Sequence, residues 1–255
     1  MESIDINKNN ISKSFSKHAH TYNKASVVQQ KVAQQLANAM MPFCCANPKV
    51  FEIGCGTGHL TNILLDKLKP QKYIVNDISP KMLSQLTPST AQKVELCIGD
   101  AEKIIWPKQI DIITSASTIQ WFNNPLSIIG KSALSINQKG LIAIATYGPK
   151  TFFQLQNLGI EGLHYNSLQE WQKTVEDNNM TMQICSSQII TQYFQSALEL
   201  MRSLQQTGVN ATHNKLSTKQ MYQLMHNYTQ TYQTSNGLPL SYEVFVFVIT
   251  KIDNV

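Results

Sequence analysis

Apolar residues recur along the chain with two different spacings. Val28, Val32, Leu36 and Met40 lie four residues apart, which predicts one face of a helix within residues 11–41. Short, almost wholly apolar runs follow, and they predict buried strands at 49–53, 72–77, 94–98, 110–115 and 141–147. Helices are predicted between them, at 58–68, from Ser79 onward and at 124–136. This alternation of strand and helix is typical of a parallel sheet.

The second half of the chain has a looser pattern. It predicts helices at 151–178, 196–204 and 218–234, and strands at 182–194 and 240–249. We therefore expect a single domain over residues 1–255. Within it we expect an N-terminal helical cover (1–41), a ligand-binding core (49–147) and a substrate side with helical insertions (148–255).

The end of the first predicted strand carries the most informative residues. Gly54, Gly56 and Gly58 alternate with Cys55 and Thr57, and a helix is predicted to follow. Glycine suits a turn with positive φ or a backbone that lies close to a ligand, and a helix N-terminus offers free N–H groups. The first βα turn of an open α/β sheet binds nucleotide-like ligands in this way. A dinucleotide fingerprint would place its third glycine where this chain has His59, which argues against a nicotinamide dehydrogenase.

An acid follows the second predicted strand. Asp77 lies nineteen residues past Gly58, where doubly wound folds place a carboxylate that accepts hydrogen bonds from ribose hydroxyls. Ile78 and Met82, just beyond it, and Ser115, at the end of the fourth strand, are further candidates for contact with the ligand.

The spacing Glu52-x-Gly54-x-Gly56-x-Gly58 resembles motif I of the class I S-adenosylmethionine (SAM) methyltransferases. The resemblance implies that the glycine loop, Cys55 included, lies against SAM and that Glu52 helps to hold its methionyl end. It also implies that Asp100 and Ala101, in a Gly-Asp-Ala run after the third strand, lie beside the adenine. Tyr22, in a segment before the first helical face, is expected to touch SAM from above.

Arginine is used once in this chain. Lysine and arginine total 21, and Arg202 is the single arginine. Its planar guanidinium can grip a carboxylate with two hydrogen bonds, which a lysine cannot do. Arg202 is therefore a candidate anchor for an acidic substrate; compositional accident or an ion pair with Glu199 is the alternative.

Several segments resemble the malonyl-acyl-carrier-protein O-methyltransferases of biotin biosynthesis. They are Phe15 to Tyr22, Ile119-Gln120-Trp121, residues 196–204 followed by Gly208, and residues 238–242. The chain departs from that family at Ala116, where asparagine is expected, and at residues 205–210.

The resemblance implies an α/β fold, with a Rossmann-like seven-stranded class I methyltransferase sheet, helices on both faces and a helical lid. It implies methyl transfer from SAM to the free carboxylate of a malonyl thioester, carried by acyl carrier protein or coenzyme A. Arg202 would anchor that carboxylate, and Gln120, Trp121 and Tyr22 would shape the pocket. A carboxylate is already ionised at neutral pH, so no general base is expected.

Composition limits the remaining classes. A net charge of +5 suits an acidic partner such as acyl carrier protein, but no lysine-rich run indicates a nucleic acid. The five cysteines (44, 45, 55, 97 and 185) include no CxxC pair, so we expect neither a disulfide framework nor a metal site. No signal peptide or membrane span is expected, and we predict a cytoplasmic monomer.

Other functions remain open on the sequence alone. A SAM enzyme for another small carboxylic acid or a quinone precursor would share motif I, and an acceptor assay would distinguish it. A regulatory module would bind the cofactor without chemistry. A nucleic-acid methyltransferase is disfavoured because the loop after the fourth strand lacks the Asn/Asp-Pro-Pro-Tyr/Phe motif of such enzymes.

Overall fold

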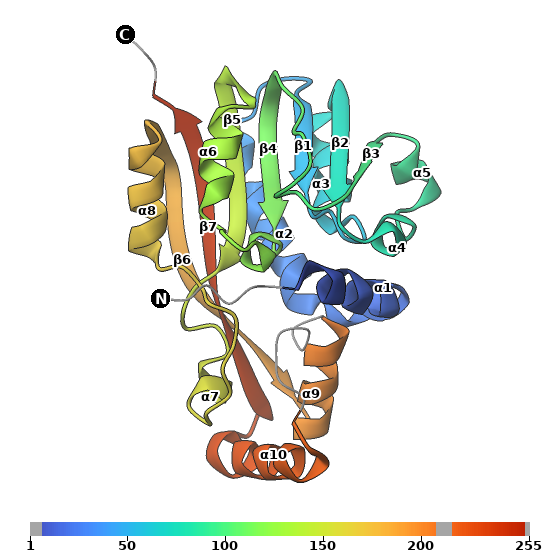
Figure 1. Cartoon of the computed structure of the whole chain (residues 1–255), viewed down its shortest axis with the longest axis vertical. Coiled ribbons are helices and arrows are strands. Elements are labelled where there is room, and N and C mark those ends of the chain that lie inside the picture. Colours follow the sequence, from blue (N-terminus) through green and yellow to red (C-terminus); the bar gives the residue numbers. More distant parts are fainter. Residues whose placement is uncertain (1–6, 208–215, 253–255) are drawn as a thin grey trace.

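The computed structural model describes residues 7–207 and 216–252 and contains one seven-stranded sheet (Figure 1). The strand order is β3-β2-β1-β4-β5-β7-β6; the first five strands are parallel and β7 runs antiparallel to both neighbours. This confirms the predicted α/β class. The strands are β1 (Lys49–Ile53), β2 (Lys72–Asp77), β3 (Glu95–Ile98), β4 (Ile110–Ala116), β5 (Ile136–Tyr147), β6 (Met180–Phe194) and β7 (Leu238–Lys251).

Helices cover both faces of this sheet. The first half of the chain supplies α1 (Lys8–Ala25), α2 (Val27–Met40), η1 (Met41–Phe43), α3 (His59–Leu68), α4 (Pro80–Leu83), α5 (Pro88–Ala91), η2 (Ile119–Trp121) and α6 (Ser127–Ala133). The second half supplies α7 (Phe153–Gln156), α8 (Leu168–Asp177), α9 (Ala197–Gln206) and α10 (Thr218–Tyr232). None of the described helices is long and apolar enough to cross a membrane.

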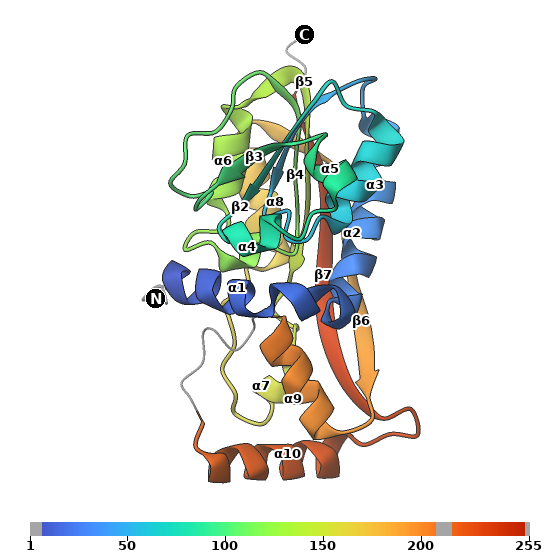
Figure 2. The same ribbon diagram turned by 90° about the vertical axis from the view of Figure 1, so that its right-hand side faces the viewer.

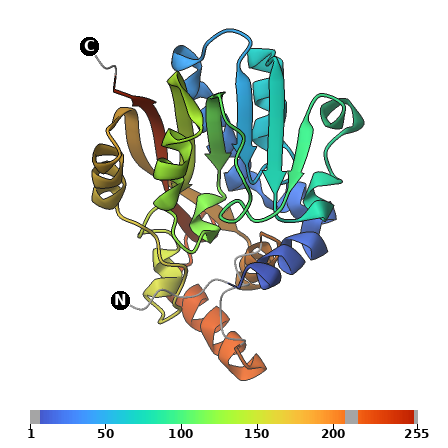
Figure 3. The same cartoon turned by 45° about the horizontal axis from the view of Figure 1, so that its top comes forward.

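Two hydrophobic cores form because alternate residues of a strand point to opposite faces. Val50 packs in the core that holds Leu36 of α2 and Leu64 of α3, whereas its neighbour Phe51 packs in the core with Ile128 of α6. Both residues are fully buried, which explains why the parallel strands appear as unbroken apolar runs. Figure 3 shows α2 and α3 on one side of the sheet and α6 on the other.

A cover lies across the carboxyl ends of the parallel strands. Helix α1 crosses the molecule just below the end of β4, and it contacts both α4 and α9 (Figures 1 and 2). Strands β6 and β7 are long enough to continue past the rest of the sheet, and α9 and α10 lie at their far end. Helix α1 therefore lies between the carboxyl ends of the parallel strands and the region formed by α9 and α10.

Three predicted helices differ from the structure. The helical stretch 11–41 is two helices that meet at Ser26, whose φ and ψ of −88° and 41° are not helical. The helix expected at 124–136 covers only Ser127–Ala133. The helix expected at 151–178 is divided into α7 and α8, because Gly159 adopts a φ of +78° and Ser167 starts a new helix with a capping box.

Candidate active site

A large cavity, here called the first cavity, opens at the carboxyl ends of β1, β2, β3 and β4. It contains about 850 Å³ of empty space, part of which is open to solvent, and α1 covers it on one side. The strand order reverses between β1 and β4, which is where open α/β sheets bind their ligands. The predicted residues that line it are Tyr22, Glu52, Gly54, Cys55, Gly56, Asp77, Ile78, Met82, Asp100, Ala101 and Trp121.

The glycine loop between β1 and α3 is shaped by backbone geometry that disfavours side chains. Gly54 has a φ of +66°, and a Cβ there would lie 2.1 Å from Cγ2 of Thr118. Gly56 has a φ of +57°, but a Cβ there would meet only Met82 Cε at 3.7 Å. Packing thus forbids a side chain at Gly54, whereas Gly56 leaves open space in the cavity wall.

Glu52 is a buried carboxylate at the end of β1. Its Oε2 accepts hydrogen bonds of 2.7 Å from Thr61 Oγ1 and from the Tyr73 hydroxyl. Burial raises the pKa of Glu52 to about 7, although both hydrogen bonds act in the opposite direction. No lysine or arginine of the described chain forms an ion pair with it. The cavity therefore presents an acid that lacks a cationic partner among residues 7–207 and 216–252.

Asp77 holds the glycine loop against the end of β2. Its Oδ2 accepts a hydrogen bond of 2.9 Å from the Gly56 amide, and its Oδ1 accepts one of 2.8 Å from the Ser79 amide. Burial raises the pKa of Asp77 to about 6, again against these hydrogen bonds. Asp77 thus fixes the loop as well as lining the cavity, a role that the sequence-based prediction did not include.

Helix α1 is tied to the strand ends by contacts that the sequence did not indicate. Lys8 Nζ lies 2.6 Å from Glu102 Oε2 and 3.8 Å from Asp100 Oδ1, so it holds the loop after β3 in place. The Ser16 and Ser79 hydroxyls share a hydrogen bond of 2.8 Å. Lys8 also lines the first cavity. No spacing rule singles out a lysine at the start of a helix, so this residue could be found only from the structure.

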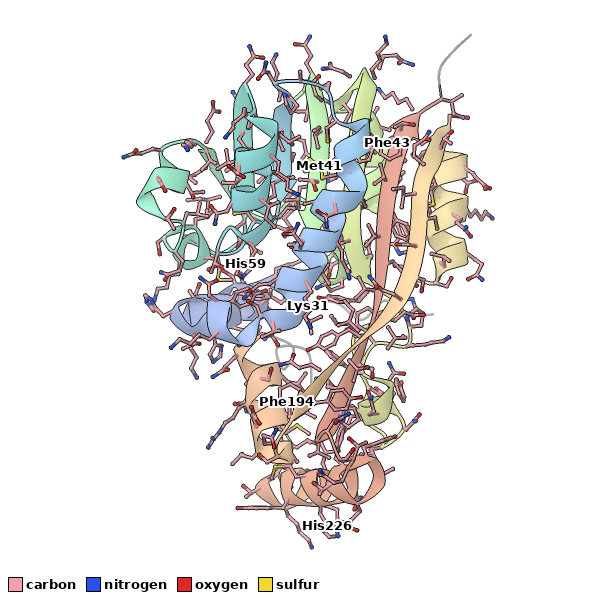
Figure 4. All side chains as sticks on the ribbon, turned by 180° about the vertical axis from the view of Figure 1, so that it is seen from behind. Lys31, Met41, Phe43, His59, Phe194 and His226 are labelled. Carbon is pink, nitrogen blue, oxygen red and sulfur yellow. The ribbon has the colours of Figure 1, made fainter. Side chains whose placement is uncertain are left out.

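The junction between α1 and α2 also reaches the glycine loop. Ser26 Oγ lies 3.1 Å from Nε2 of His59, and Figure 4 shows His59 beside these two helices. Burial lowers the pKa of His59 and so favours the neutral form of its imidazole. The residue that replaces the third glycine of a dinucleotide fingerprint therefore connects the cover to the loop.

A smaller second cavity of about 360 Å³ adjoins the first. Five residues line both cavities and form the wall between them: Phe15, Tyr22, Gln29, Ser117 and Trp121. The Phe15 ring makes edge contacts with Tyr22 and Trp121 at centroid distances of 6.0 and 5.6 Å. Gln120 lines the second cavity and not the first.

Three predicted site residues lie outside both cavities. Ser115 donates a hydrogen bond of 2.8 Å to the Ile53 carbonyl and so joins β4 to β1 behind the cavity wall. Gly58 is the N-cap of α3. Arg202 is exposed on α9. It lies two residues from the buried Leu200 and Leu204, and this spacing places it on the opposite side of the helix from them.

The packing of α9 turns its apolar side inward and Arg202 outward, so Arg202 lines neither cavity, and its role as an anchor for the acceptor stays a prediction. Gly208, which belongs to the resemblance, and Val209 and Asn210, where the chain departs from the family, lie outside the described residues.

Comparison with known proteins places this geometry in a family. A family model described as a methyltransferase domain matches residues 46–227. The malonyl-acyl-carrier-protein O-methyltransferase of Acinetobacter baylyi is 30% identical over 92% of each chain, and that of Bacteroides thetaiotaomicron is 28% identical over 96% of this chain and 98% of its own.

Solved structures agree on the fold. A crystal structure of a methyltransferase candidate from Bacillus halodurans superposes with a TM-score of 0.64 at 15% identity, over 86% of this chain and 98% of that one. The sheet order, the glycine loop and these matches show that the chain belongs to the malonyl-acyl-carrier-protein O-methyltransferase family of methyltransferases.

Proposed function

We propose that this enzyme transfers a methyl group from SAM to the free carboxylate of a malonyl thioester, an early step of biotin synthesis. The observation that carries the proposal is the pair of adjoining cavities that share one wall. A methyl donor in the first cavity and an acceptor in the second would meet at Tyr22, Ser117 and Trp121. The acceptor would be carried by acyl carrier protein or by coenzyme A.

The first cavity has the features that SAM requires. When bound, SAM supplies an electrophilic methyl group on a sulfonium. The unpaired Glu52 suits the ammonium group of the methionyl end, and the open space at Gly56 admits a ligand close to the backbone. Asp77 at the end of β2 and Asp100 and Ala101 after β3 line the same cavity, which supports their proposed contacts with ribose and adenine.

The described residues around the second cavity include no carboxylate or imidazole that could act as a general base. No Asp, Glu or His is among the described residues that line it. A malonyl carboxylate has a pKa near 4 in water and needs no deprotonation at neutral pH. The protein then contributes alignment and exclusion of water, and alignment alone is worth on the order of 7–11 kcal/mol in favourable cases.

The charge on the cover favours an acidic carrier. Residues 8–40, which form α1 and α2, contain five lysines and no Asp or Glu. Lys13, Lys17, Lys24 and Lys31 are exposed there. A field of this sign steers an acidic protein toward the cover and raises the rate of encounter.

An acceptor panel tests the proposal. Malonyl-acyl carrier protein, malonyl-coenzyme A, succinyl-coenzyme A, butyryl-coenzyme A and free malonate are each incubated with enzyme and SAM. Methyl ester formation on the two malonyl thioesters, and none on the butyryl thioester, is expected. Methylation of free small acids in preference to thioesters would instead support a small-acid methyltransferase.

A further inference from the structure

The second cavity is lined by several hydroxyl-bearing side chains. Tyr147, Tyr165 and Tyr242 line it, and each is at least nine-tenths buried. They come from the end of β5, from the segment before α8 and from β7, so the fold brings three distant phenols together. No lysine, arginine or histidine is among the described residues that line this cavity.

These hydroxyls retain unused donor capacity. The Tyr147 hydroxyl lies 2.9 Å from Ser117 Oγ, and since each group has one proton, this pair keeps one O–H for a third partner. The hydroxyls of Tyr165 and Tyr242 have no hydrogen-bond partner among the described residues. Burial raises the pKa of all three phenols, so they remain neutral donors at physiological pH.

Gln120 gives an independent sign that the cavity receives a polar ligand. Its Nε2 donates a hydrogen bond of 2.7 Å to the Ser117 carbonyl, which fixes the orientation of the amide. Its Oε1 is buried and has no partner within the described chain. A buried acceptor without a partner destabilises the free protein, and a ligand with an N–H group would relieve this cost.

We propose that the second cavity binds the acceptor carboxylate through neutral hydroxyl donors, with Tyr165, Tyr242 and the Tyr147–Ser117 pair in place of an arginine. This inference rests on the proposed function, because it names how that acceptor is recognised. Arg202 lies on the outer side of α9. In this arrangement it takes no part in holding the carboxylate.

The chemistry favours neutral donors. A carboxylate oxygen forms a bond to the methyl carbon while the sulfur–carbon bond breaks and its electron pair remains on sulfur. An anion and a cation thus become two neutral groups, and no proton moves. A guanidinium would attract the anion most strongly before the reaction and lose that attraction in the transition state, which slows the step. Hydroxyl donors also compensate the buried carboxylate for its lost hydration, and less of their attraction disappears in the transition state.

The test compares single variants at four positions. Tyr165→Phe and Tyr242→Phe each remove one hydroxyl from the cavity; Arg202→Ala removes the guanidinium. Tyr228→Phe is the matched control, because this buried phenol bonds to the Pro239 carbonyl away from both cavities. Calorimetry measures the affinity of each variant for malonyl-coenzyme A, for butyryl-coenzyme A, which lacks the carboxylate, and for S-adenosylhomocysteine.

The ratio of malonyl to butyryl affinity should fall about 10- to 100-fold in Tyr165→Phe and Tyr242→Phe, since each loses a hydrogen bond to a charged group. Arg202→Ala and Tyr228→Phe should keep the wild-type ratio, and affinity for S-adenosylhomocysteine should not change in any variant. An unchanged ratio in both cavity variants, or a collapse in Arg202→Ala, would overturn the inference. Absence of methyl transfer by the wild-type enzyme would instead reject the proposed function, and the affinity ratios would still report on the cavity.

Discussion

The hydroxyl of Tyr73 donates a hydrogen bond of 2.7 Å to Oε2 of Glu52, so β2 supports the carboxylate that β1 presents to the first cavity. This support is incomplete, because burial still raises the pKa of Glu52 to about 7. The carboxylate is therefore held in position while its charge depends on pH near neutrality. A ligand ammonium beside it would favour the ionised form.

Cofactor binding should consequently depend on pH through Glu52. With a pKa of about 7, Glu52 is mostly protonated at pH 5.5 and half ionised at pH 7, so affinity for SAM should rise about tenfold over this range. Titration calorimetry in buffers of different ionisation enthalpy should also detect proton release on binding.

Two variants provide the controls for this prediction. Glu52→Gln keeps acceptors for Thr61 and Tyr73 but cannot ionise, so its affinity should be low and flat across the same range. Tyr73→Phe removes a hydrogen bond that lowers the pKa of Glu52, so the rise in affinity should move to higher pH. A wild-type profile in Glu52→Gln would show that this carboxylate does not control binding.

Stability of the ligand-free protein should change with pH in the opposite direction. The folded pKa values of Glu52 and Asp77, about 7 and about 6, exceed their ordinary values. Such groups stabilise the fold fully below their unfolded pKa, and this contribution is lost as pH rises through the folded pKa. The difference in unfolding free energy between wild type and Glu52→Gln should therefore shift by on the order of a few kcal/mol between pH 4.5 and 7.5. Urea unfolding at both pH values measures it, and a constant difference would contradict the assignment.

Alanine substitutions at two glycines distinguish the effect of backbone strain on stability from the effect of a side chain on cofactor binding. Gly56 and Gly159 both have positive φ, and a Cβ at Gly159 would meet nothing within 4 Å. Gly56→Ala and Gly159→Ala should each lower stability by about 1–2 kcal/mol. Only Gly56→Ala should also weaken SAM binding, by about 1–3 kcal/mol, because its methyl group enters the cavity. Equal SAM affinity in the two variants would mean that the loop does not contact the cofactor.

The positive charge on α1 should raise the rate at which the enzyme and an acidic carrier protein associate. Lys13→Glu combined with Lys17→Glu should lower kcat/KM for malonyl-acyl carrier protein about tenfold at low salt, and high salt should remove most of this difference. Lys139→Glu combined with Lys173→Glu makes the same change in net charge on β5 and α8 and is the matched control. Steady-state kinetics that do not distinguish the two pairs would exclude α1 as the steering surface.

The local pattern of apolar residues and glycines was enough to predict most of the sheet and the glycine loop. The bounds of β1 and β2 agree with the prediction, because both are short apolar runs buried on two faces. Most residues assigned to the cofactor also line the first cavity, since they follow strand ends that a parallel sheet brings together. Ser115 was assigned to the same edge, but its side chain is used to join two strands.

The acceptor side could not be predicted in the same way. The rarity of arginine says nothing about the direction of the Arg202 side chain, which is set by how α9 packs its apolar face. Tyr147, Tyr165 and Tyr242 come from separate segments, so no sequence spacing connects them. Lys8 acquires its role only because α1 lies against the loop after β3.

Intact-mass spectrometry of malonyl-acyl carrier protein, after incubation with the enzyme and SAM, would detect the proposed methyl transfer itself. We expect the carrier to gain the mass of one methyl group, with an equal amount of S-adenosylhomocysteine formed and no change in butyryl-acyl carrier protein. An unchanged carrier mass, with enzyme that binds SAM in the same sample, would contradict it.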